Sequence, residues 1–198
     1  PRRAAKRPIR SGSVRHDRPM DAASVSFLRE VLSSVWVEGT RRLGRALRAT
    51  RSPGGLLVVG TPDDDPWHLT AHLADEARLS GLDQLRPTLV RWSPPPGAPP
   101  HLSIGLERIA AARRGETLLV VAEDRAPVPL LERVDDARRT GTTIVALDGG
   151  DPELEGLAHE ALAVPPSAPL SFDAAQHLVS LAAGEEPRRR GLRERLPP

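Results

Sequence analysis

The chain has 198 residues, a net charge of +2 and no cysteine. Its length suits one domain of ordinary size with flanking segments. The lack of cysteine excludes a disulfide framework and a thiolate metal site. No apolar run approaches the roughly 20 residues that cross a bilayer, and no signal-peptide pattern opens the chain. We therefore expect a cytoplasmic protein without a membrane partner.

Basic residues gather at the two ends of the chain. Residues 1–19 hold seven Arg or Lys against one Asp, and they lack any apolar period, which predicts a disordered arm. The arm is either a nucleic-acid-binding segment or a solvated tail upstream of the true start. The only methionine, Met20, stands directly before the first helical pattern and favours the second interpretation. Residues 185–198 form a basic tail.

The first half of the domain alternates helical and strand patterns. Residues 21–50 carry a long apolar stripe at helical spacing, typical of an amphipathic helix. The apolar runs at 56–60 and 87–92 predict two strands, and a helix over 67–78 lies between them. Asp65 is the predicted N-cap of that helix, with Pro66 at its first position. After a proline-rich loop, a further helix is predicted over 103–114.

The second half contains a strand–helix–strand unit. Residues 118–122 are an unbroken apolar run, which indicates a strand buried on both faces of a parallel sheet. A helix over 127–139 and a strand over 142–147 follow, and this order predicts a right-handed crossover between parallel strands. A last helix is predicted over 171–183.

Two segments of this half resemble the SIS (sugar isomerase) domain family, which includes phosphosugar isomerases and phosphosugar-sensing regulators. Residues 137–147 (ARRTGTTIVAL) are similar to one of the family's helix–strand segments, and residues 154–165 (LEGLAHEALAVP) to the segment that ends in Val-Pro. Over residues 20–184 the resemblance implies an α/β fold: a five-stranded parallel sheet between two layers of helices, flavodoxin-like, with a long N-terminal helix. It also implies a homodimer and a sugar or sugar-phosphate ligand.

The loops that hold phosphate in SIS enzymes are rich in hydroxyl groups, and here they carry charges instead. Ligands of open parallel sheets bind beyond the carboxyl ends of the strands. The candidate ligand-binding residues at those ends are Thr61, Asp63, Asp64, Glu123, Asp124 and Arg125. Their carboxylates would repel a dianionic phosphate, and Arg125 alone compensates. We therefore expect a degenerate SIS domain, a pseudoenzyme with a binding, regulatory or scaffolding role and no cofactor.

A second hypothesis is a divergent isomerase. His72 and Glu76 resemble the His and Glu of the phosphoheptose isomerase branch of the family, and His177 stands where that branch has an acid–base histidine. A Glu/His pair suits aldose–ketose isomerisation of a sugar phosphate, and the four-residue spacing also suits a metal. The chance frequency of this spacing favours a solvated helix face. We interpret His68, His101 and His159 as surface residues.

The acidic residues of the loops have two interpretations of their own. Asp63, Asp64, Asp148 and Asp151 could bind Mg²⁺ or a basic partner. Asp is also common at turns and N-caps regardless of function, and this interpretation is favoured. We expect no metal site, and nucleic acid binding through the arm is the weakest of the functional hypotheses.

Overall fold

The computed structural model describes residues 34–185, which fold around one sheet. The five strands are all parallel, in the order β2-β1-β3-β4-β5. This is the flavodoxin-like order, in which the direction of strand addition switches between β1 and β3. The strands are β1 (Leu56–Val59), β2 (Pro87–Val90), β3 (Thr117–Ala122), β4 (Thr143–Asp148) and β5 (Glu160–Ala163).

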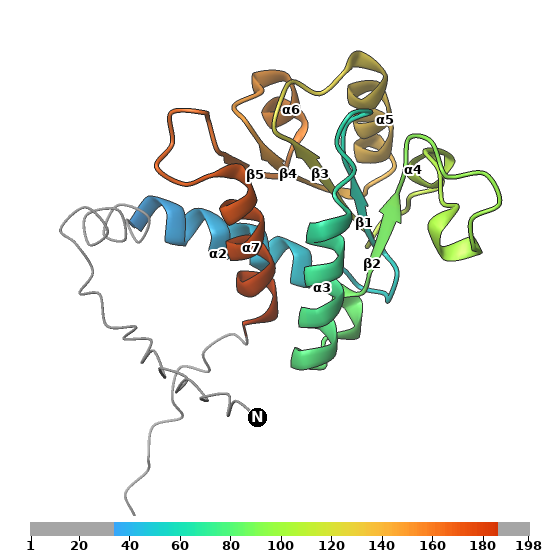
Figure 1. The fold of residues 1–198 in the computed structure, drawn as a ribbon, viewed down its shortest axis with the longest axis horizontal. Coiled ribbons are helices and arrows are strands. Elements are labelled where there is room, and N and C mark those ends of the chain that lie inside the picture. Colours follow the sequence, from blue (N-terminus) through green and yellow to red (C-terminus); the bar gives the residue numbers. More distant parts are fainter. Residues whose placement is uncertain (1–33, 186–198) are drawn as a thin grey trace, which may run out of the picture.

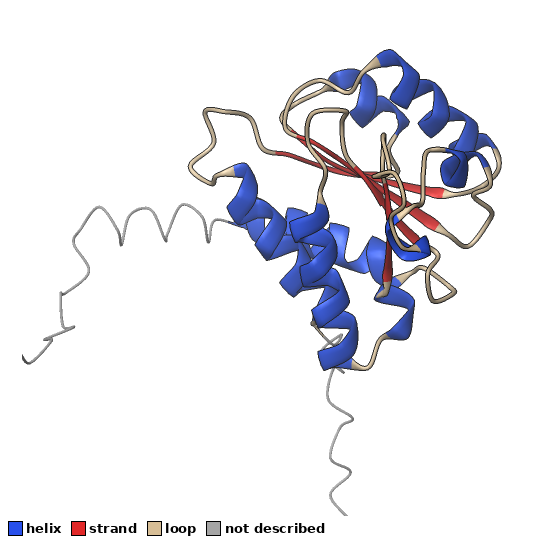
Figure 2. Ribbon diagram, turned by 45° about the vertical axis from the view of Figure 1, so that its right-hand side comes forward, coloured by secondary structure: helices blue, strands red, loops and turns tan. Residues whose placement is uncertain are grey.

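Helices cover both faces of the sheet, as Figures 1 and 2 show. One layer contains α2 (Ser34–Arg48), α3 (Trp67–Ser80) and α7 (Phe172–Gly184). The other contains α4 (Glu107–Ala110), α5 (Val128–Arg139) and α6 (Pro152–Leu157). Short 3₁₀ turns occupy Asp83–Leu85 and Pro100–Leu102. Within residues 34–185, no helix has both the length and the hydropathy that crossing a bilayer requires.

Side chains along each strand point alternately to the two faces of the sheet, and they form two separate hydrophobic cores. In β1, Leu56 and Val58 pack toward α2, α3 and α7, whereas Leu57 and Val59 pack toward α4, α5 and α6. All four side chains are fully buried, because a parallel strand with helices on both faces has no solvent side. The unbroken apolar runs in the sequence are the signature of this arrangement.

The predicted fold class is confirmed, and two details of the prediction are wrong. The helix predicted over 103–114 shortens to α4, because Ile104 accepts a hydrogen bond from Arg91 N at 2.9 Å and Gly105 bridges Arg91 in parallel. The N-cap of α3 is Pro66 rather than Asp65, whose side chain pairs instead with Arg91. The basic arm, the tail beyond residue 185 and the first part of the predicted N-terminal helix lie outside the described residues.

Candidate functional site

The loops after β1 and β3 meet at the switch in strand order and enclose a cavity of about 300 Å³. All six candidate ligand-binding residues of the sequence line it, together with Pro62 and Pro127. These two loops come together because β1 and β3 are adjacent and parallel, so that both strands end at the same edge of the sheet. A role in ligand binding for these residues stays a prediction.

Four carboxylates and one guanidinium surround this loop cavity. Asp63, Asp64, Glu123, Asp124 and Arg125 are all exposed. Within residues 34–185, none of the five takes part in an ion pair. The cavity therefore carries a net negative charge, which disfavours an anionic ligand and favours a cationic one.

The start of α5 has few hydrogen-bond donors left for a phosphate. Pro127 and Pro129 have no backbone N–H group, and the N–H of Ala126 donates to Oδ2 of Asp151 at 2.9 Å. A helix N-terminus binds phosphate through free N–H groups. Here the N–H of the residue before the N-cap is already bonded to a carboxylate of the same chain, and the two prolines have no N–H to offer.

The loop after β4 buries the other two aspartates of the predicted acidic cluster. Asp151 is the N-cap of α6 and accepts hydrogen bonds from the N–H groups of Glu153 and Leu154. Asp148 Oδ1 accepts from Gly150 N at 2.7 Å and from Asp151 N at 2.9 Å. These contacts fit the favoured interpretation of the two aspartates as N-cap and turn residues, but both side chains are buried rather than solvated. They hold the loop in shape.

A smaller cavity of about 110 Å³ lies beside β2 and contains a charged pair. Arg91 contacts Asp65 at 2.6 Å, while Asp65 Oδ1 and Arg91 Nε have no hydrogen-bond partner. Burial raises the pKa of Asp65 against the opposing effect of Arg91. Trp92 Nε1 donates to the carbonyl of Gly60 at 2.9 Å and closes this side of the cavity.

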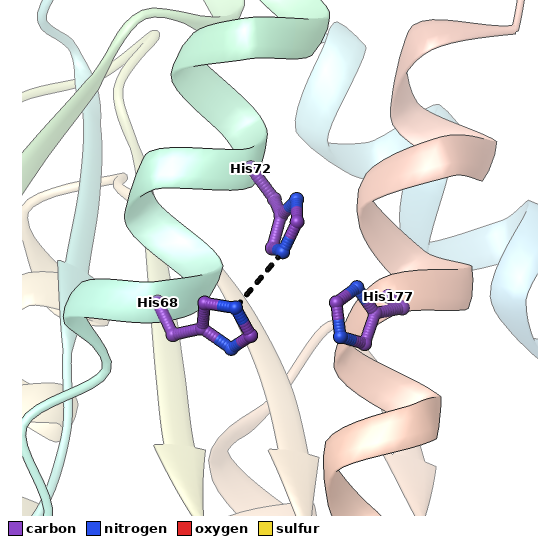
Figure 3. Close-up of side chains that lie close together, drawn as sticks. All are labelled: His68, His72 and His177. Atoms are coloured by element: carbon purple, nitrogen blue, oxygen red, sulfur yellow. Dashed lines mark hydrogen bonds between the residues drawn. The ribbon is translucent and has the colours of Figure 1, made fainter. Parts of the chain in front are cut away.

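Three histidines meet in the helix layer that contains α2, α3 and α7 (Figure 3). His68 and His72 lie one turn apart on α3, and His177 lies on α7, which packs beside α3. The Nε2 atoms of His68 and His72 are 3.1 Å apart, and the rings of His72 and His177 have centroids 4.4 Å apart. One potential ligand atom from each of the three lies within 4.8 Å of the others. We call this set the histidine cluster.

Two of the three candidate catalytic residues belong to the histidine cluster, and Glu76 does not. A Cβ added to Gly184 would lie 2.0 Å from Glu76 Oε2, so this carboxylate sits beside the C-terminal end of α7. His68 is the third member of the histidine cluster, although its sequence context suggested a plain surface residue. The signal for it was visible in the sequence as His68-x-x-x-His72, the spacing that puts two side chains on one helix face.

Comparison with solved structures supports the architecture. The sugar isomerase domain of an RpiR transcription factor from Sphaerobacter thermophilus superposes with a TM-score of 0.52 at 14% identity, over 80% of this chain and 84% of that one. The fold is SIS-like. Because the identity is so low, this likeness describes the fold alone. Comparisons with family models and with curated protein sequences give no match.

Two further solved structures that resemble this chain are larger than it. A candidate sugar binding protein from Salmonella typhimurium LT2 gives a TM-score of 0.51 at 15% identity, over 81% of this chain and 46% of that one. A candidate phosphosugar isomerase from Silicibacter pomeroyi DSS-3 gives 0.50 at 15% identity, over 80% and 47%. The chain thus spans about half of each of these two proteins. The expected similarity to SIS-domain proteins is confirmed.

Proposed function

We propose that this SIS-like domain is a non-catalytic binding domain that recognises a sugar derivative without a phosphate group and acts in regulation or as a scaffold. The observation that carries the proposal is the start of α5, where Asp151 takes the N–H of Ala126 and two prolines remove two more donors. A phosphate at this position would also face Glu123 and Asp124 across the cavity. The same carboxylates suit sugar hydroxyls or an amino sugar, since they accept hydrogen bonds.

A thermal-shift series with the full chain tests this proposal. Neutral sugars, amino sugars and sugar phosphates are compared at equal concentration. Saturation at one hundred times Kd adds about 2.7 kcal/mol to the free energy of unfolding, which raises the Tm by about 5–11 °C for a domain of this size. We expect the shift with an amino sugar or a neutral sugar. A shift confined to sugar phosphates contradicts the proposal.

A matched variant shows whether the ligand binds at the loop cavity. Replacing Asp63 and Asp64 by Asn keeps the shape of the first loop and removes two of the four negative charges. We expect the amino-sugar shift to decrease by at least half in this double variant. Replacing Asp135 and Asp136 of α5, both outside the cavity, changes the net charge equally and serves as the control. Equal losses in the two double variants would place the binding elsewhere.

The proximity of His72 and His177 supports a second candidate function, sugar-phosphate aldose–ketose isomerisation. Two imidazoles whose centroids are 4.4 Å apart can serve as an acid and a base on one small substrate. Glu76, the third residue of that hypothesis, points to the end of α7. Conversion of an aldose phosphate to its ketose by the purified chain, abolished in His177→Ala, would replace the binding proposal by this one.

A further inference from the structure

We propose that His68, His72 and His177 form a binding site for one divalent transition-metal ion of the Zn²⁺ class, and that Asp173 orients two of the three ligands. Figure 3 shows the three rings converging between α3 and α7. The site shares no residue with the two loop cavities. The inference is therefore independent of the proposed sugar binding.

The distances between the donor atoms suit a tetrahedral ion. Zn²⁺ binds imidazole nitrogen at about 2.0–2.1 Å, which puts two ligand nitrogens about 3.3 Å apart in a tetrahedral site. The Nε2 atoms of His68 and His72 are already 3.1 Å apart. One potential ligand atom from each of the three residues lies within 4.8 Å of the others, and rotation of the His177 side chain would complete the set.

Asp173 occupies the position of an orienting carboxylate. Its Oδ1 is 3.6 Å from His68 Nδ1, and its Oδ2 is 3.7 Å from His177 Nε2. A carboxylate opposite one ring nitrogen favours N–H at that nitrogen and leaves the lone pair on the other. Asp173 thereby favours the tautomers in which His68 Nε2 and His177 Nδ1 are free to bind a metal. His72 supplies the third lone pair through Nε2.

The ligand types and their exposure define the class of ion. Three neutral imidazoles favour Zn²⁺, Ni²⁺, Co²⁺ or Cu²⁺ over Mg²⁺ or Ca²⁺, which require oxygen ligands. The side chains of His68 and His177 are 46% and 41% exposed, so an ion can enter directly from solvent. Three protein ligands leave a fourth position for water, as in sites of the open type.

The proposed ligand set differs from the one that the His72-x-x-x-Glu76 spacing suggests. Glu76 Oε2 lies against Gly184, whereas His68 Nε2 lies against His72 Nε2. The competing explanation is that the three imidazoles simply contact one another, with a hydrogen bond between His68 and His72. The two explanations predict opposite results in a metal titration.

The test is isothermal titration of the tag-free full chain with ZnCl₂ alone, without any sugar. We expect one ion per chain, and a loss of affinity of at least about 100-fold in each of His68→Ala, His72→Ala and His177→Ala. His101→Ala is the control, because His101 is exposed and outside the cluster. Glu76→Gln should bind as the unaltered chain does. No binding by the unaltered chain, or equal affinity in His68→Ala, overturns the proposal, as does a loss in Glu76→Gln that equals the loss in His72→Ala.

Two further measurements separate a ligand from a merely structural residue. Asp173→Asn removes the charge of the orienting group and should lower the affinity about 10- to 100-fold while leaving one ion per chain; an unchanged affinity excludes the orienting role. The ring of Trp67 is 5.5 Å from that of His68. Ni²⁺ should therefore quench tryptophan fluorescence in the unaltered chain and much less in Trp67→Phe. Equal quenching in both would place the ion away from the cluster.

Discussion

Asp148 is a buried carboxyl group with one satisfied oxygen and one unsatisfied oxygen. Oδ1 accepts two backbone N–H groups of the turn after β4, while Oδ2 has no partner among the described residues. Burial raises the pKa of Asp148, and the neighbouring Asp151 acts in the same direction. The folded state therefore binds the Asp148 proton more tightly than the unfolded chain does. Its contribution to stability is largest below the unfolded pKa and is lost as the pH rises through the folded pKa.

Asp148→Asn should reduce this pH dependence. Asparagine keeps an oxygen that can accept from Gly150 N and Asp151 N, and it carries no charge at any pH. The free energy of unfolding of the variant, relative to the unaltered chain, should rise as the pH increases through the window above the normal aspartate pKa. Urea denaturation between about pH 4 and about pH 8 measures it. A constant difference across that range would show that Asp148 titrates alike in the folded and unfolded states.

The sequence could not separate the four aspartates of the acidic loops, because burial is decided by the other strands and helices. Asp63 and Asp64 are exposed at the loop cavity, whereas Asp148 and Asp151 are buried in a turn. All four occur in similar turn-rich contexts. The histidine cluster could not be recognised in the sequence either, since His68 and His177 are 109 residues apart in the chain. Only the packing of α3 on α7 brings them together.

At the level of single elements, α2 and α7 form the most extensive helix–helix contact of residues 34–185. A Cβ added to Gly44 would lie 2.5 Å from the carbonyl oxygen of Ala182, so the two backbones approach each other directly. Arg48 donates to the carbonyls of Ala182 and Ala183 and thereby satisfies the C-terminal end of α7. The amphipathic pattern of the first helix predicted an apolar face, but it did not identify α7 as the partner.

Gly44→Ala should lower the free energy of unfolding by about 1–3 kcal/mol, the usual effect of overpacking a well-packed contact. The clash is with backbone atoms, which cannot rotate away. Gly156→Ala in α6 is the control, because nothing lies within 4 Å of its added Cβ. This change should be neutral or stabilise by up to about 1 kcal/mol. Chemical denaturation of both variants checks the pair, and equal effects would argue against the close contact.

The strands and the longer helices were predictable because their patterns are complete within short segments. Strands β3 and β4 show unbroken apolar runs, and α5 ends at Arg139 with Thr140 as its C-cap, before Gly141, which has a φ of 92°. A positive φ at this position suits glycine. The segment that became α4 was predicted less well, because Arg91, directly after β2, pairs with the backbone of Ile104 and Gly105.

In the molecule as a whole, the sheet order accounts for the loop cavity, and the two helix layers account for the histidine cluster. The order β2-β1-β3 places the first and third loops together, which general rules for parallel sheets anticipate. No comparable rule places α7 beside α3. The expected homodimer stays a prediction, since the described residues form a single chain.

A chain that ends at residue 171 should fail to fold. It lacks α7, whose Ala175, Val179 and Ala183 are fully or almost fully buried in the core between α2, α3 and the sheet. Removal of this helix exposes Leu43, Leu47 and Leu73 to water, a loss of about 5–9 kcal/mol that is comparable to the margin of about 5–15 kcal/mol that keeps a typical domain folded. Circular dichroism and solubility distinguish the outcomes. A cooperative thermal transition in the shortened chain would contradict this expectation.

The pairing of α2 with α7 also has a consequence for synthesis. The helix that begins the described region emerges from the ribosome first, and its partner emerges last, after all five strands. Until then, Leu43 and Leu47 have no complete core to enter. Because domains fold as units during translation, this domain cannot close its α2 side before α7 has emerged. Until α7 has emerged, the apolar face of α2 therefore lacks the helix that covers it.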